Sequence, residues 1–118
     1  MKTSELTDIA LDWAVAKCKY PELVWGSSIG IHHASHQIVI PHLLEPQCYW
    51  NPSTVWAQGG PIIEREDIAL YPHGDGSYEA EVYLNPLRNH GPTPLIAAMR
   101  CYVASKLGDD VELPEELL

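Results

Sequence analysis

The sequence predicts an α+β fold with two main helices packed against a small antiparallel sheet. Apolar residues recur at helical spacing near both ends of the chain, and a stretch of alternating apolar and polar residues lies between them. Helix, several strands and helix is not a regular β-α-β series, which argues against a parallel sheet. A chain of 118 residues suits one core, so we expect residues 1–118 to form a single domain.

The first helix is predicted to start with Thr3 or Ser4 as its cap and to run to about Lys19, before Pro21. Its apolar positions repeat at helical spacing: Leu6, Ile9, Ala10, Trp13 and Ala16. A stripe of acids is expected on another face: Glu5, Asp8 and Asp12. After this helix, Leu23 to Trp25 is a candidate short strand, and Gln37 to Ile40 is a candidate short strand or turn.

Residues 49–64 are rich in tryptophan, glycine and proline, and we expect them to form an ordered loop packed on the domain. Four residues in this stretch interrupt a helix: Pro52, Gly59, Gly60 and Pro61. The loop should lead into a strand that starts at Ile62 and Ile63.

The same loop is a candidate ligand site. Trp56 offers a flat apolar face and Gln58 an amide, while Gly59 and Gly60 allow the backbone to approach a ligand closely. The alternative is a structural turn that only delivers the chain into the next strand.

A β-hairpin is predicted between Ile68 and Leu84. Ile68 to Tyr71 forms one strand, Pro72 to Ser77 has the residues of a turn, and the alternation from Tyr78 to Leu84 gives a strand with one wet face. Residues 85–92 are expected to be a loop.

A second helix is predicted to start at the cap residue Thr93, with Pro94 at its first position, and to stop at Gly108. It is apolar nearly all round, which is typical of a helix at the centre of its domain. Arg100 is its one charge between residues 95 and 104. Because buried guanidinium groups need partners, Arg100 either pairs with an acid such as Asp8 or Asp12 or anchors an anionic ligand. The helix start at Thr93 can likewise bind an anion or only water.

The charge balance limits the partners. Sixteen acidic and seven basic residues give a net charge of −9, so direct DNA binding is not expected. There is no apolar run long enough to cross a membrane and no signal-peptide core, which indicates a cytosolic protein. Three widely spaced cysteines, Cys18, Cys48 and Cys101, fit reduced thiols better than disulfides.

The sequence does not favour an enzyme. The histidines at 32, 33 and 36 lack the spacing of a standard zinc site, so we expect a polar loop and no metal or cofactor. Candidate nucleophiles are present at Ser27, Ser28, Cys48 and Ser53, but no nucleophile elbow or cysteine signature surrounds them. Phosphate-binding glycine loops are also missing.

Three parts of the chain resemble NinX-like proteins of tailed phages and prophages. They are the N-terminal Met1 to Thr7 with Leu11 to Cys18, the stretch Pro52 to Glu66, and the stretch Gly91 to Gly108. Together they cover roughly half of the chain, and long matches are more specific than short motifs. Residues 20–47, with their histidines, do not share in the resemblance.

The resemblance implies a small phage accessory protein acting in the cytoplasm of a host bacterium. By analogy with other small phage proteins, we expect a non-catalytic binder of a nucleotide-like ligand that sequesters a host immune signal. We also expect a homo-oligomer, because this small chain carries a large apolar load. Its expected ligand-binding residues are Trp56, Gln58, Gly59, Gly60, Thr93 and Arg100. The alternatives are an inhibitor that docks on a host protein, a recombination or replication accessory protein, and an enzyme that degrades a nucleotide.

Overall fold

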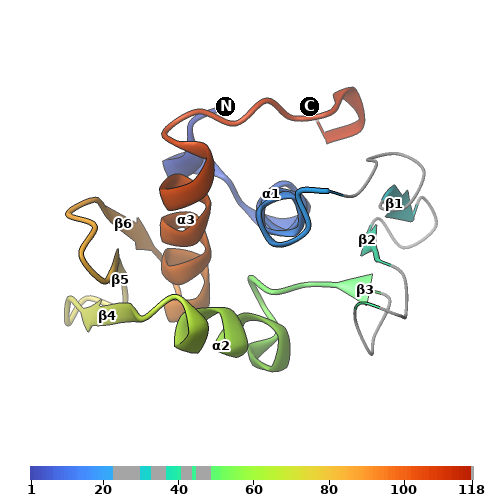
Figure 1. Cartoon of the computed structure of the whole chain (residues 1–118). Coiled ribbons are helices and arrows are strands. Elements are labelled where there is room, and N and C mark those ends of the chain that lie inside the picture. Colours follow the sequence, from blue (N-terminus) through green and yellow to red (C-terminus); the bar gives the residue numbers. More distant parts are fainter. Residues whose placement is uncertain (23–29, 33–36, 41–43, 45–48, 118) are drawn as a thin grey trace.

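The computed structural model describes residues 1–22, 30–32, 37–40, 44 and 49–117, and this part of the chain has an α+β architecture. Three α-helices lie between two small antiparallel sheets, which occupy opposite sides of the molecule (Figure 1). The predicted fold class is therefore confirmed. The candidate strand at 23–25, Cys48, Ser27, Ser28, and His33 and His36 lie outside the described residues.

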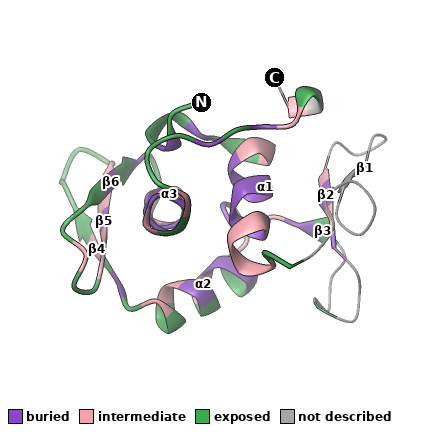
Figure 2. Cartoon of the chain, turned by 45° about the horizontal axis from the view of Figure 1, so that its top comes forward, coloured by how far each residue is buried: buried purple, intermediate pink, exposed green. Residues whose placement is uncertain are grey.

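Helix α3 (Pro94–Leu107) is the centre of the fold, as predicted. The hydroxyl oxygen of Thr93 accepts a hydrogen bond from the backbone N–H of Ile96 at 3.1 Å, and Gly108 ends the helix with a φ of 85°. Figure 2 looks along α3, which is surrounded by one sheet, the other two helices and the chain ends. Its buried side chains face all of these neighbours, which explains why it is apolar nearly all round.

The first sheet packs on α3 and contains β4 (Ile68–Pro72), β5 (Tyr78–Val82) and β6 (Arg88–Gly91) in that order. The predicted hairpin is confirmed as β4 and β5. The expectation of a loop at 85–92 was wrong, because residues 88–91 pair with β5 along their whole length. Strand β6 carries no apolar alternation, since its buried residues are Asn89 and Gly91. The alternation of apolar and polar residues therefore could not predict this strand.

Helix α1 (Asp8–Lys19) begins later than predicted, with Thr7 at the N-cap position. Thr3 does not cap it, because Thr3 lies in a short 3₁₀ helix, η1 (Thr3–Glu5). The Thr3 hydroxyl instead donates to the carbonyl oxygen of Gly108 at 2.6 Å, which ties the start of the chain to the end of α3. Helix α1 ends at Lys19, shortly before Pro21, as expected.

Helix α2 (Trp56–Arg65) overturns the prediction of a loop and of a strand at Ile62. Pro61 lies on the exposed side of this helix. A proline in a helix interior costs about 3 kcal/mol relative to alanine. Packing offsets that cost, because α2 buries one face against the domain, namely Gln58, Gly59 and Ile62. Tertiary contacts have overridden local propensity in this segment.

The second sheet lies beyond α1 and contains β1 (Gly30–His32), β2 (Gln37–Val39) and β3 (Tyr49–Trp50). The candidate strand at Gln37 is confirmed as β2, which pairs antiparallel with both neighbours. A short 3₁₀ helix, η2 (Glu115–Leu117), follows the buried Val111 and Leu113.

Candidate functional site

A pocket of about 270 Å³ lies where α1, β2 and the segment between β3 and α2 meet. It is lined by five polar residues, Asp8, Asp12, Gln37, Asn51 and Thr54, and by the two apolar residues Ile9 and Ile38. Asp12 is the buried charge of this wall. Its carboxylate accepts a hydrogen bond from the backbone N–H of Ser53 at 2.9 Å, so the segment that precedes α2 is fastened to α1 at this point.

Burial raises the pKa of Asp12 from its ordinary 3.8 to about 6, against the opposing effect of hydrogen bonding from Ser53. The nearby charge of Asp8 raises the pKa further. Within the described part of the chain, Asp12 forms no ion pair with a lysine, arginine or histidine. Among the described residues, this buried acid therefore has no compensating cation, which is costly and is characteristic of functional sites.

The pocket is rich in hydrogen-bond acceptors. Besides the carboxylates of Asp8 and Asp12, the side-chain oxygen of Gln37 is buried and has no donor among the described residues. Ile9 and Ile38 add an apolar surface. Such a wall suits a small ligand that carries several N–H donors and one flat apolar face.

The structure engages Gln58 within the protein. Its side-chain oxygen accepts from the backbone N–H of Asn51, and its amide nitrogen donates to the carbonyl of Tyr49 at 2.8 Å. Gly59 also packs tightly within the protein, because a Cβ at this position would lie only 2.6 Å from Leu95 Cδ2. Two of the predicted ligand-binding residues thus serve the packing of α2.

None of the other predicted site residues is among the described residues that line the pocket. Trp56 is 54% exposed at the start of α2, two residues beyond the pocket residue Thr54, and Gly60 lies one turn further along the helix. Thr93 caps α3. Arg100 lies two turns beyond Thr93 in the same helix. The six residues are not brought together in one site.

Arg100 does not pair with an acid of the first helix, so that expectation was wrong. Its Nε donates to the carbonyl oxygen of Leu6 at 2.8 Å and its Nη1 to that of His90 at 2.9 Å. Asp12 is turned toward Ser53 instead. The guanidinium is thus partnered by backbone carbonyls and joins the N-terminal segment to β6 across α3.

Asp12 was expected on an acidic stripe of the first helix, and its burial beside a pocket was not predicted. The signal available in the sequence was its position between Leu11 and Trp13, which are both buried. The covering groups come from a segment about 40 residues later, as the distance in sequence between Asp12 and Ser53 shows.

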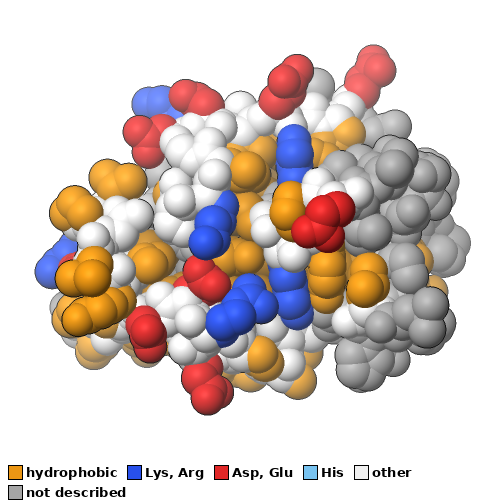
Figure 3. Space-filling view, viewed as in Figure 1, with side chains coloured by type: hydrophobic (Ala, Val, Ile, Leu, Met, Phe, Trp, Pro, Cys, Tyr) orange, Lys and Arg blue, Asp and Glu red, His pale blue; other side chains and the backbone are white. Residues whose placement is uncertain are grey.

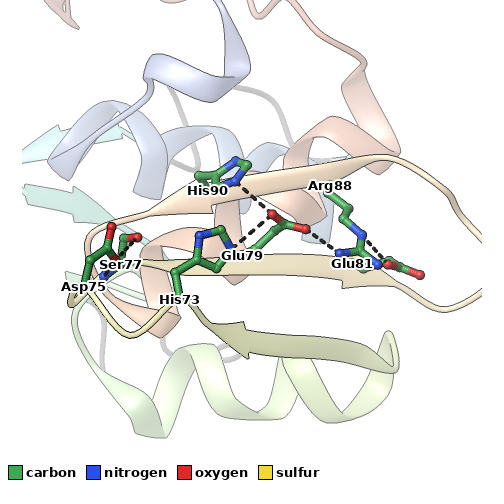
Figure 4. Close-up of polar contacts among 7 residues, drawn as sticks. All are labelled: His73, Asp75, Ser77, Glu79, Glu81, Arg88 and His90. Atoms are coloured by element: carbon green, nitrogen blue, oxygen red, sulfur yellow. Dashed lines mark hydrogen bonds and ion pairs between the residues drawn. The ribbon is translucent and has the colours of Figure 1, made fainter.

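A second polar cluster lies on the outer face of the first sheet. One oxygen of Glu79 lies 3.2 Å from His73 Nε2 and 2.9 Å from His90 Nε2, and the other oxygen lies 2.6 Å from Nη1 of Arg88 (Figure 4). The hydrogen bond from Arg88 is the main cause of a lowered pKa at Glu79. None of these residues was predicted as a site residue, because the strand that brings His90 to Glu79 was not predicted from the sequence.

Large apolar side chains are exposed beside this cluster, at the end of β5 and in the connection to β6. Tyr83 is 68% exposed, Leu84 86% and Leu87 49%. Figure 3 shows hydrophobic side chains gathered over the sheet side of the molecule, on the left. This apolar tip offers a surface for a macromolecular partner.

A family model described as "Bacteriophage P22, NinX" matches residues 2–106 of the chain. The match includes the pocket, the cluster on the sheet and all six residues predicted from the sequence. The comparison with curated proteins found no match. None of the helices in the described part of the chain has the length and apolar character needed to cross a membrane.

Proposed function

The chain belongs to the bacteriophage P22 NinX family, and we propose that it is an accessory protein that binds a small nucleotide-like ligand without converting it. It acts in the cytoplasm of the infected bacterium, where it sequesters a nucleotide signal of host immunity. The observation that carries the proposal is the acceptor-lined pocket around the buried Asp12.

The chemistry of the pocket supports a nucleobase as its occupant. Bases present N–H donors on their Watson–Crick edge, and aspartate is a common acceptor for such groups. Ile9 and Ile38 provide apolar contacts for the flat face of a ring. A volume of about 270 Å³ accommodates one base with part of its sugar, and not a whole dinucleotide.

The negative charge of Asp8 and Asp12 favours a nucleotide whose phosphate groups lie outside the pocket. Asp8 and Asp12 repel a phosphate at short range, so the phosphates of a bound nucleotide must point toward solvent. Trp56 lies two residues beyond the pocket residue Thr54 and is exposed, which makes it available for stacking on a second base or on the sugar. This role for Trp56 keeps one of the residues predicted from the sequence at the site.

The test is a binding screen of the full chain against nucleosides, cyclic mononucleotides, cyclic dinucleotides, ADP-ribose derivatives and NAD. The bound compound is released by heating and identified by chromatography. Recovery of unchanged ligand supports a sequestering protein, whereas a converted product would identify an enzyme. A screen with no binding would refute the proposal.

Two variants locate the ligand. Asp12→Asn should weaken binding by about 10–100-fold, because a hydrogen bond to a charged acceptor is lost. Asp67→Asn, which changes an exposed acid outside the pocket, is the matched control and should bind as the natural chain does. Trp56→Ala should weaken binding roughly tenfold while leaving the melting temperature almost unchanged, because the ring is exposed. Equal losses of binding and stability would assign Trp56 a structural role.

The apolar tip favours a second candidate function, inhibition by docking on a host protein. With a net charge of −9, the chain is complementary to a basic partner surface that has an apolar centre. Leu84 is the most exposed apolar residue of the tip. Its replacement, Leu84→Asp, should abolish capture of such a partner and leave nucleotide binding intact.

A further inference from the structure

Three ligand-type atoms converge on the outer face of the first sheet: Nε2 of His73, Nε2 of His90 and one carboxylate oxygen of Glu79. They come from the turn after β4, from β6 and from β5, respectively, and all lie within 4.8 Å of one another. Glu79 and His90 are direct partners in the β5–β6 register. His73 reaches the same point because its backbone N–H donates to Ser77 and closes the turn.

This donor set is that of a transition metal. Two imidazoles and a carboxylate bind zinc in catalytic sites that keep a fourth position open. A tetrahedral zinc ion with nitrogen ligands at about 2.0–2.1 Å holds its ligand atoms roughly 3.3 Å apart. The contacts of Glu79 with the two imidazoles, at 3.2 and 2.9 Å, are close to that spacing.

The surroundings of Glu79 favour this use. Arg88 holds one oxygen of Glu79 and also binds Glu81 at 2.7 Å, so the other oxygen of Glu79 stays directed at the imidazoles (Figure 4). Carboxylate ligands of metals are commonly oriented by such an outer hydrogen bond. Two carboxylates and one guanidinium give these three residues a charge of −2 + 1 = −1, which attracts a dication. Both imidazoles are exposed, so an ion can enter from solvent.

We propose that the chain binds one Zn²⁺ through His73 Nε2, His90 Nε2 and the free oxygen of Glu79, with water in the fourth position. This revises the expectation that the chain binds no metal. It also shifts attention from the histidines at 32, 33 and 36 to a pair that is distant in sequence. The site shares no residue with the Asp12 pocket, so the zinc proposal does not depend on the nucleotide proposal.

The experiment is a calorimetric titration of the metal-free full chain with zinc chloride. One equivalent should bind, and His73→Gln, His90→Gln and Glu79→Gln should each weaken this binding at least about tenfold. The matched control is Glu64→Gln, which changes an exposed acid on α2 outside the cluster. It should retain the affinity of the natural chain. Circular dichroism in the presence of a chelator verifies that each variant is folded.

A second measurement locates the ion. Imidazole nitrogen spectra of the natural chain should show that zinc shifts the Nε2 signals of His73 and His90 and leaves those of the other histidines unchanged. Failure of the natural chain to bind zinc would overturn the proposal. So would zinc binding that survives in both histidine variants, because the ion would then lie on other residues.

Discussion

Asp12 places a carboxyl group in the interior of the protein at a cost in stability. It is buried, it accepts a hydrogen bond from the Ser53 backbone, and burial raises its pKa to about 6. A neutral asparagine has nearly the same shape and can accept the same hydrogen bond. Replacing Asp12 by asparagine would therefore stabilise the fold. The presence of an acid at this position must be explained by something other than stability.

This predicts a specific dependence of stability on pH. Below about pH 3.8 the carboxyl is protonated in both the folded and the unfolded chain, and its burial adds no charge penalty. Between pH 3.8 and about 6 the folded chain keeps a proton that the unfolded chain releases, so the free energy of unfolding falls as pH rises. The loss amounts to about 3 kcal/mol, because each pKa unit is worth 1.36 kcal/mol. Above about pH 6 it stays constant.

Asp12→Asn should therefore be more stable than the natural chain at pH 7.5, by up to about 3 kcal/mol, and equally stable near pH 4. Urea unfolding of both proteins across this range measures the difference. The pKa values of Glu66 and Glu79 are lowered, so the stability that these two groups contribute is lost as pH falls. Both proteins contain these groups, so their contributions cancel in the difference between the two free energies of unfolding. A difference that does not change with pH would show that Asp12 carries no such penalty.

At the scale of elements, the sequence predicted the helices and strands whose formation depends on residues close together in the chain. The cap at Thr93, the proline at position 94 and the glycine at 108 lie within one helix, and α3 was predicted at its observed bounds. The turn residues between β4 and β5 likewise predicted the hairpin. Helix α2 and strand β6 were missed because distant contacts decide them. A close approach of the Pro52 carbonyl and Leu95 selects Gly59, and no local pattern records it.

The adjacent glycines of α2 provide a test of this explanation. At Gly59 an added Cβ would collide with the Pro52 carbonyl and with Leu95, so Gly59→Ala should destabilise the fold by roughly 1–3 kcal/mol. At Gly60 the nearest atom to an added Cβ is 3.9 Å away, in the ring of Trp56. Gly60→Ala should instead stabilise the fold by up to about 1 kcal/mol, through the higher helix propensity of alanine.

Denaturant unfolding of the two variants decides the matter. Opposite signs at neighbouring positions are expected from the helix with its tight contact at Gly59. Two stabilising substitutions would mean that Gly59 has room, and two destabilising ones would mean that residues 56–65 are not helical.

For the whole molecule, hydrogen bonds join the start of the chain to the segment that follows α3. The backbones of Met1 and Val111 bond to each other, and Thr3 bonds to Asp109 and Gly108, so the first and last described segments lie together across one end of α3 (Figure 2). The two sheets lie on opposite sides of the molecule (Figure 1). The sequence predicted one small sheet and not two, because the strands of the second sheet have only two or three residues each.

The charge of the whole molecule predicts opposite salt dependences for the two candidate partners of the apolar tip. We expect a homo-oligomer from the sequence, yet two copies that each carry −9 repel one another. Salt screens this repulsion over a Debye length of about 10 Å at 0.1 M, so association of the chain with itself should strengthen as salt is added. Docking on a basic host protein has the opposite salt dependence, because screening weakens the attraction between opposite charges.

Light scattering of the chain at low and high salt tests for self-association. Leu84→Asp is the variant, and Trp56→Ala is the control at an exposed apolar residue elsewhere. A mass that rises with salt in the control but not in Leu84→Asp assigns the tip to a second copy of the chain. A monomer under all conditions refutes the homo-oligomer and leaves the tip to a host partner.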